Sequence, residues 1–128
     1  MKFAILHHGA CSGSRFHYRI DRAGESRLEL AESDAGQHPG CIGIVVDGNA
    51  DAAAPTEAQL AALRKLLLQL KSRYPDIQIG GHRQVRGETT SCPGKAFPLT
   101  AIRDWAGHDL IIERDNGLQD MIDRQYRL

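Results

Sequence analysis

The sequence predicts an α/β fold in which a mixed central β-sheet is flanked by helices. Three observations support this prediction: short apolar runs typical of buried strands, one segment in which apolar and polar residues alternate, and one long segment with leucines at helical spacing. These segments alternate along the chain, and a turn between two of them indicates a hairpin. The chain of 128 residues is long enough for one domain with a small core.

The expected strands differ in their burial. Residues 41–46 are β-branched and nearly all apolar, as in a central strand that is buried on both faces. Residues 16–21 alternate apolar and polar side chains, as in a half-buried strand. A turn containing Gly24 follows and leads to a hairpin partner. In chain order, we expect strands at residues 3–6, 16–21, 27–30, 41–46 and 77–81.

The clearest helix is expected at residues 57–73. This segment carries a stripe of leucines at helical spacing, and Thr56 and Gln59 have the spacing of a capping box. We expect the leucine stripe to face the core. A second helix is expected at residues 99–106, and a C-terminal helix at about 117–127.

Charge and hydropathy limit the partners. Lys and Arg together number 16, as do Asp and Glu, so the formal net charge is zero and we expect no nucleic-acid partner. No segment approaches the roughly 18 apolar residues of a membrane span, so none is expected. The apolar start of the chain stops at His7, which is too short for the ~7–15 apolar residues of a signal peptide. We therefore expect a protein that is cytoplasmic as synthesised and acts as a monomer.

Two histidines and one cysteine form the candidate chemical site. His7 follows one apolar strand and His82 follows another, while Cys92 lies ten residues beyond His82 in a loop. Because functional groups gather at the C-terminal ends of strands in open α/β sheets, these side chains can converge. Two imidazoles, one thiolate and an open fourth position form a catalytic zinc site. The spacing alone is equally compatible with surface histidines and a buried cysteine.

Five stretches of the chain match one family, in the family's order. The most specific is Gly-His-Arg at residues 81–83 followed by Thr-Ser-Cys-Pro-Gly at residues 90–94. The others lie at residues 5–9, 16–24, 42–44 and 55–63. On these residues the chain resembles the N-acetylmuramoyl-L-alanine amidase family, which includes phage lysozyme-type amidases and animal peptidoglycan recognition proteins. The resemblance implies an amidase-like domain at residues 1–106, with residues 107–128 as a helical extension packed on it.

The resemblance also implies a zinc ion, held in a groove at the strand ends by His7, His82 and Cys92. The implied substrate is peptidoglycan or a muropeptide, in which the amide bond between N-acetylmuramic acid and L-alanine is hydrolysed. Zinc suits this reaction because it lowers the pKa of its bound water and polarises the scissile carbonyl. Thr90 occupies the position of a family residue that faces the developing oxyanion, where a hydroxyl can donate one hydrogen bond. A cytoplasmic enzyme of this kind would reach the cell wall by release or by another route of delivery.

One departure from the family pattern affects catalysis. The family's catalytic tyrosine falls on Phe16, which has no hydroxyl to position or activate the water. Three interpretations follow. Tyr18 can point to the same strand face as Phe16, or Glu88 in the loop before Cys92 can act as the general base. Alternatively, the protein is a non-catalytic, zinc-containing module that binds peptidoglycan or muropeptides. The retention of all three ligands favours catalysis.

We also expect the groove to differ from that of the family, and the remaining cysteines and histidines to lie outside the zinc site. The segment from His7 to Phe16 is shorter than is usual in the family and the one from His82 to Cys92 is slightly longer, so the groove is expected to differ. A metal-independent thiol hydrolase built on Cys92 and His82 is a further mechanism to test. The other side chains are expected to be structural or on the surface: His8 beside the ligand on its strand, His17 and His38 on the surface, and Cys11 and Cys41 as small buried residues.

Overall fold

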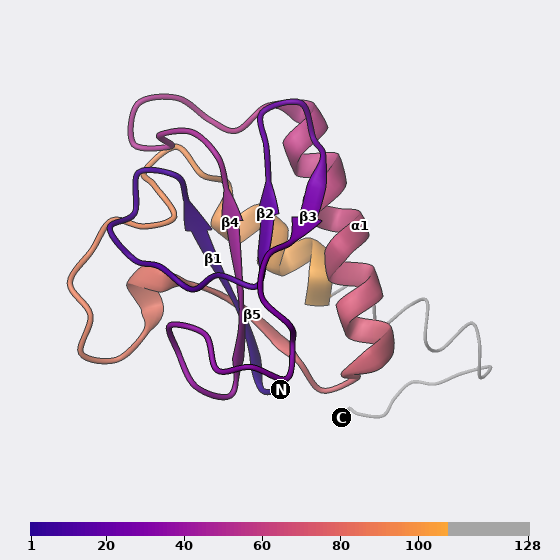
Figure 1. Cartoon of the computed structure of the whole chain (residues 1–128). Helices are drawn as coiled ribbons and strands as arrows, with labels where there is room; N and C mark the ends of the chain where they lie inside the picture. Colours follow the sequence, from indigo (N-terminus) through magenta and orange to yellow (C-terminus); the bar gives the residue numbers. More distant parts are fainter. Residues whose placement is uncertain (108–128) are drawn as a thin grey trace.

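Five strands form one mixed sheet, and a long helix packs across it (Figure 1). The structure is a computed structural model and describes residues 1–107. The order of the strands in the sheet is β3-β2-β4-β1-β5. In chain order the elements are β1 (Phe3–His8), β2 (Tyr18–Ile20), β3 (Ser26–Leu28), β4 (Cys41–Val46), α1 (Glu57–Arg73) and β5 (Gln78–Gly81), and residues 99–107 are also helical.

The pairing of the strands confirms the predicted mixed sheet. β1 pairs in parallel with β4 and β5, β4 pairs in parallel with β2, and the β2–β3 hairpin is antiparallel. Because β1 and β5 are parallel neighbours, with Leu6 opposite Gly81, the two strands end at the same edge of the sheet. The residues that follow this pair, His7 and His82, therefore start side by side.

The main core lies between one face of the sheet and the helices. The leucines predicted to face the core do so, since Leu63, Leu67 and Leu70 are fully buried. They share one cluster with the residues of β1 that point to this side, Ala4 and Leu6. The alternation of a strand turns Ile5 and His7 to the opposite face. The site of interest is thus on the face away from α1.

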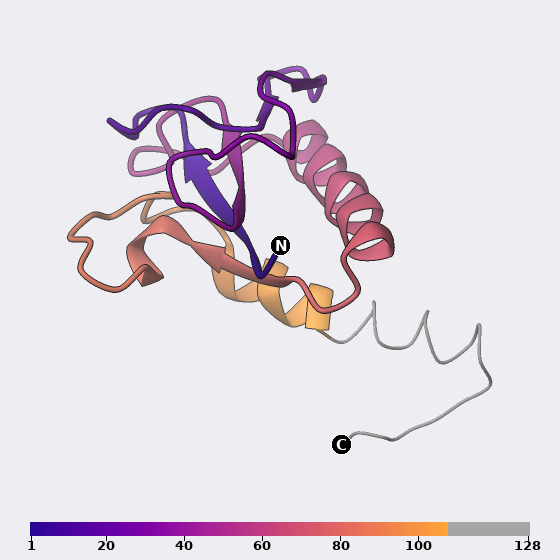
Figure 2. The ribbon, with the colours of Figure 1, turned by 60° about the horizontal axis from the view of Figure 1, so that its bottom comes forward.

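The helix at residues 99–107, orange in Figure 2, lies beside β5. Its buried residues Leu99, Ile102 and Ala106 belong to the same core cluster as the leucines of α1. Arg103 donates from Nε to the carbonyl oxygen of Ile79 at 2.9 Å, which fastens the helix to the outer strand. Both helices of the described residues therefore contribute to one core.

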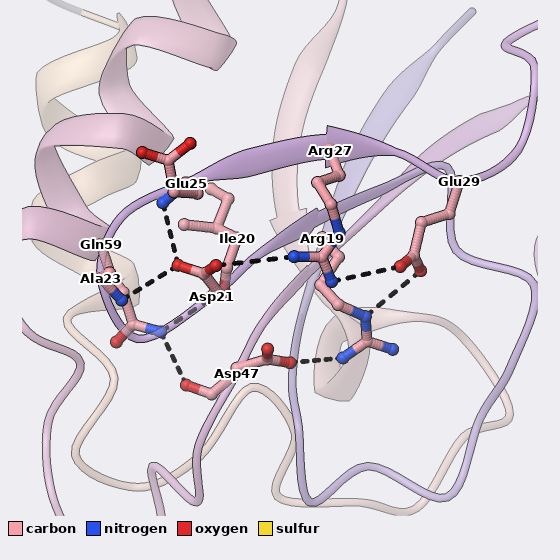
Figure 3. A network of polar contacts seen from close by, with 9 residues as sticks. All are labelled: Arg19, Ile20, Asp21, Ala23, Glu25, Arg27, Glu29, Asp47 and Gln59. Atoms are coloured by element: carbon pink, nitrogen blue, oxygen red, sulfur yellow. Dashed lines mark hydrogen bonds and ion pairs between the residues drawn. The ribbon is translucent and has the colours of Figure 1, made fainter.

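The start of α1 is tied to the sheet. Thr56 and Gln59 form the predicted capping box, in which each side chain accepts a hydrogen bond from the other's backbone N–H at 3.0 Å. The Gln59 amide also donates to the carbonyl oxygen of Asp47 at 2.8 Å, just beyond β4. Figure 3 shows this contact within a larger network, in which Arg19 of β2 pairs with Asp47 and Glu29. The network joins the hairpin, the end of β4 and the helix into one frame.

β2 is shorter than the strand predicted at residues 16–21. Arg15 has a φ of 61°, in the left-handed region, so the chain turns sharply before the strand begins. Regular pairing with β4 starts only at Tyr18. As a result Phe16 and Tyr18 do not share a face, because Phe16 contacts His7 whereas Tyr18 packs against the main core.

Part of the predicted organisation lies outside the described residues. The C-terminal helix expected at about 117–127 falls there, as does the extension at 107–128 apart from its first residue. Among the described residues, no helix is long and apolar enough to cross a membrane.

Candidate metal centre

The two histidines predicted as ligands lie at the sheet edge where β1 and β5 end. His7 is fully buried on the face opposite α1, and His82 opens a single 3₁₀ turn, His82–Gln84, directly after β5. The centroids of their rings are 4.9 Å apart. Parallel pairing of the two strands thus brings together two imidazoles that are far apart in the sequence.

Cys92 reaches the same point from the loop that follows His82. Its carbonyl oxygen accepts a hydrogen bond from the N–H of Arg83 at 2.8 Å, and its own N–H donates to Thr90 Oγ1 at 3.1 Å. Sγ lies 3.6 Å from His7 Nδ1, and the residue is 1% exposed. The structure therefore brings the three predicted ligands together.

A fourth side chain, that of Cys11, lies at this point, although the sequence-based prediction did not include it among the ligands. Its Sγ lies 3.4 Å from His82 Nδ1 and 3.7 Å from His7 Nδ1. One potential ligand atom from each of His7, Cys11, His82 and Cys92 lies within 4.8 Å of the others, and we call these four residues the His–Cys cluster. Cys11 was expected to be a small buried residue; it is half-buried, and its sulfur lies beside two imidazoles. Its position four residues after His7 is the signal that could have found it, because a turn there returns the chain to the strand end.

His82 is also held from its other side. Its Nε2 lies 2.7 Å from one carboxylate oxygen of Glu88, and the second oxygen lies 3.9 Å from His38 Nε2. The His38 ring stacks with that of His7 at 6.0 Å between centroids and meets His82 edge-on at 5.2 Å. The expectation that His38 lies on the surface is wrong. The loop that carries it is hydrogen-bonded to the loop after β1, which folds both loops over this face.

Burial sets the protonation of His7 and Cys92. The pKa of His7 falls to about 3 because burial, and then the neighbouring His82, disfavour the imidazolium ion. Burial raises the pKa of the Cys92 thiol to about 12. Near pH 7, His7 is therefore the neutral imidazole that a metal binds, whereas Cys92 needs a cation beside it to lose its proton.

The donor set fits zinc. Within the described residues, His7 Nδ1 is fully enclosed and meets two thiol sulfurs, which are weak hydrogen-bond partners for a buried ring nitrogen. A cation between the nitrogen and the sulfurs satisfies all of them. Nitrogen and sulfur donors select zinc over Mg²⁺ and Ca²⁺, which prefer oxygen ligands.

The two aromatic candidates occupy different faces. Tyr18 donates its hydroxyl proton to Glu32, and its oxygen accepts a hydrogen bond from Arg73 at 3.4 Å, beside the main core. The prediction that Tyr18 reaches the site is therefore wrong, because the chain bends at His17, between Phe16 and Tyr18, and the regular alternation of the strand starts only at Tyr18. Phe16 instead lies against His7, with ring centroids 4.5 Å apart, and is 8% exposed.

The remaining histidines have structural contacts. His17 is buried rather than on the surface: its Nδ1 accepts a hydrogen bond from the N–H of Gly43 at 2.9 Å. Its Nε2 lies 2.9 Å from the carbonyl oxygen of Asp34, so both ring nitrogens link neighbouring segments. His8 points to the face opposite His7, where its Nδ1 accepts a hydrogen bond from the N–H of Ala50 at 3.0 Å.

Comparison with known proteins identifies the family. A family model described as N-acetylmuramoyl-L-alanine amidase matches residues 2–95, and the chain belongs to that family. A search of the curated proteins found no match.

Solved structures share the fold. The amidase LysC from Clostridium intestinale is 23% identical, with a TM-score of 0.73 over 83% of this chain and 85% of that one. Drosophila peptidoglycan recognition protein SD is also 23% identical, with a TM-score of 0.70 over 82% of this chain and 80% of that one. The Ph2119 endolysin of a Thermus scotoductus bacteriophage is 19% identical, with a TM-score of 0.64 over 73% and 77%.

Proposed function

We propose that the protein is a zinc-dependent amidase that hydrolyses the bond between N-acetylmuramic acid and L-alanine in peptidoglycan or a muropeptide. The observation that carries this proposal is the convergence of His7, His82 and Cys92 at the ends of β1 and β5. Membership of the amidase family supports the substrate class and the bond that is cut.

The residues of the site suggest their roles. His7 and His82 would bind zinc through Nδ1 and Cys92 through Sγ, since these atoms face one another. When bound, zinc lowers the pKa of a coordinated water and polarises the scissile carbonyl. The Thr90 oxygen already accepts a hydrogen bond from the N–H of Cys92, which leaves its hydroxyl proton to be donated to a developing oxyanion.

A cavity beside the cluster supports substrate binding. It has a volume of about 620 Å³, within the range of small-molecule sites, and lies along β1 and β5 on the face away from α1. Ile5 and Val85 give it apolar surface, Arg86 and Arg103 give it positive charge, and His38 links it to the cluster. Apolar walls with cationic groups suit a stem peptide, which carries carboxylates.

We propose that Glu88 positions His82 instead of acting as the general base. Its carboxylate contacts Nε2, whereas Nδ1 of the same ring faces the cluster. A carboxylate that accepts the second ring proton of a metal-bound histidine fixes the tautomer and the orientation of that ring. The hydrogen bond to His82 holds the pKa of Glu88 below its ordinary value, so the carboxylate is ionised near pH 7.

The substitution Glu88→Ala tests this role. We expect zinc affinity to fall about 10- to 100-fold, as is usual when a partner of a metal-bound histidine is lost, with Glu88→Gln falling less because its amide oxygen still accepts. At saturating zinc, kcat should stay within about tenfold of the wild type, whereas loss of a general base costs about 10²–10⁴-fold. Chelator competition and initial rates at saturating zinc measure the two effects. A low kcat with unchanged zinc affinity would restore Glu88 as the base.

A second candidate function is a zinc-containing module that binds muropeptides without cutting them. Phe16 favours it, because the ring that faces His7 lacks a hydroxyl to act on water. A metal-independent thiol hydrolase built on Cys92 and His82 is disfavoured, because burial raises the pKa of Cys92 to about 12 and its sulfur lies 3.6 Å from Nδ1 of His7.

The deciding experiment is a digest of purified peptidoglycan and of defined muropeptides, analysed by mass spectrometry. We expect free stem peptide to appear, to vanish when a chelator removes the metal, and to return when zinc is added. Co-sedimentation with peptidoglycan but no release at any zinc concentration would establish the binding module. Release that survives the chelator and is lost on thiol alkylation would establish the thiol hydrolase.

A further inference from the structure

We propose that Cys11 is a fourth zinc ligand, so that two imidazoles and two thiolates enclose the metal in the substrate-free protein. The inference rests on the zinc site proposed above and adds a residue to it. Catalytic zinc sites characteristically have three protein ligands and an open position, whereas four protein ligands form a closed site. Whether Cys11 binds the ion therefore determines whether the zinc site of the substrate-free protein is open or closed.

Three distances in the His–Cys cluster are those expected of a tetrahedral site. Zinc lies ≈ 2.3 Å from sulfur and ≈ 2.0–2.1 Å from nitrogen, so a sulfur and a nitrogen bound to one tetrahedral ion are about 3.6 Å apart. Cys11 Sγ lies 3.4 Å from His82 Nδ1 and 3.7 Å from His7 Nδ1, and Cys92 Sγ lies 3.6 Å from His7 Nδ1. All three separations match, and two of them belong to Cys11.

The backbone around Cys11 directs its sulfur to the cluster. The N–H of Cys11 donates to the carbonyl oxygen of His8 at 3.0 Å, which closes a turn directly after β1. The N–H of Gly9 donates to the carbonyl oxygen of Val46 at 2.9 Å and anchors that turn to β4. The N–H of Gly13 then donates to Cys11 Sγ at 3.4 Å, a contact that stabilises a thiolate.

Cys41 is a free cysteine that lies away from the His–Cys cluster and serves as a comparison for Cys11. It is half-buried at the start of β4, at the opposite end of the strands from His7, and is absent from the cluster. Its burial resembles that of Cys11, so exposure alone does not distinguish the two. The difference is that only Cys11 has imidazole nitrogens at ligand distance.

Coordination by Cys11 has a chemical consequence for the proposed amidase. Binding of the ion by both thiols displaces two protons to solvent, with no change in oxidation state. Cys11 is half-buried in a loop, whereas His7 and Cys92 are almost fully enclosed. If Cys11 held the ion with the other three residues, the site would be closed at rest, and Cys11, as the half-buried residue, would be the one placed to give way to water and substrate.

Cobalt substitution counts the thiolates directly. Co²⁺ replaces zinc in such sites, and each bound thiolate adds to the sulfur-to-cobalt absorption in the near ultraviolet. We expect Cys11→Ala to lower this absorption per bound cobalt to about half, because two thiolates become one. Cys92→Ala is expected to lower it equally, and Cys41→Ala, the matched control, to leave it unchanged. Full absorption in Cys11→Ala, with cobalt bound, would overturn the proposal.

The same measurement separates this inference from the proposed function. Halved absorption in Cys11→Ala supports the fourth ligand even if no stem peptide is released. In that case only the proposal of amidase activity is contradicted. If the wild type binds neither cobalt nor zinc, the proposed metal site and the proposed fourth ligand are both contradicted. Cys11→Ser provides a second variant that keeps a polar side chain in the turn, and its circular dichroism and melting temperature report whether the fold is retained. Its absorption is expected to match that of Cys11→Ala.

Discussion

Replacing His7 with alanine is expected to lower zinc affinity by about 10²-fold or more and to remove amidase activity. Structural zinc sites bind with about 10–16 kcal/mol, or roughly 3 kcal/mol for each of four ligands, which corresponds to about 10²-fold. Activity should fall further, by about 10³-fold, because the metal supplies several kcal/mol of transition-state stabilisation. Zinc content after gel filtration and chelator competition measure the zinc affinity, and stem-peptide release measures the activity.

His8→Ala is the matched control for this prediction. His8 is the next residue along β1 and is also buried, but it points to the opposite face and is absent from the His–Cys cluster. Its loss leaves the N–H of Ala50 without its acceptor and should cost about 1–3 kcal/mol of stability while zinc binding is retained. A His7→Ala protein that keeps tightly bound zinc would overturn the ligand assignment.

Phe16→Tyr is expected to raise kcat by about 10²-fold, the value of one well-placed hydrogen-bond donor or proton-transfer group in a transition state. The ring already lies against His7, 4.5 Å away between centroids, and the family resemblance places a tyrosine at this position. Zinc affinity should not change, because Phe16 contributes no ligand atom. Initial rates with a defined muropeptide, at equal zinc content, measure the effect.

Tyr18→Phe is the reciprocal control. Tyr18 lies two residues away but on the other face, where its hydroxyl donates to Glu32. Removing that hydroxyl should lower stability by about 1 kcal/mol and leave kcat unchanged. Equal rates for Phe16→Tyr and the wild type, both in the native background and with Cys11→Ala, would show that this position does not act on the water.

The sequence predicts the regular elements well where local signals and burial agree. β4 was expected at residues 41–46 and α1 at 57–73, and both have these bounds. The first is set by a continuous apolar run and the second by a capping box and a leucine stripe. The positions of His7 and His82 at strand ends follow from the same signals, because each histidine directly follows an apolar strand.

The rest of the site depends on loops, whose course is set by long-range contacts that have no period in the sequence. His38 lies beside the cluster because its loop hydrogen-bonds to the loop after β1, whereas Cys11 reaches the cluster through a turn directly after that strand. Tyr18 was assigned to the wrong face because the chain bends at His17 and the strand starts only at Tyr18, which no local pattern in the sequence marks. Glu88 was identified as a carboxylate near the site, but its contact with His82 Nε2 required the folded loop.

The hydrogen bond from the N–H of Arg83 to the carbonyl oxygen of Cys92 joins the two ends of the segment between these ligands. His82 and Cys92 are thereby presented as a rigid chelating pair, and the entropy cost of closing the segment is met when the protein folds, before any ion arrives. Apart from Glu88, which contacts His82, the exposed residues 86–89 within it can change without moving the ligands. This part of the groove is thus free to diverge in shape between relatives while the coordination geometry stays the same.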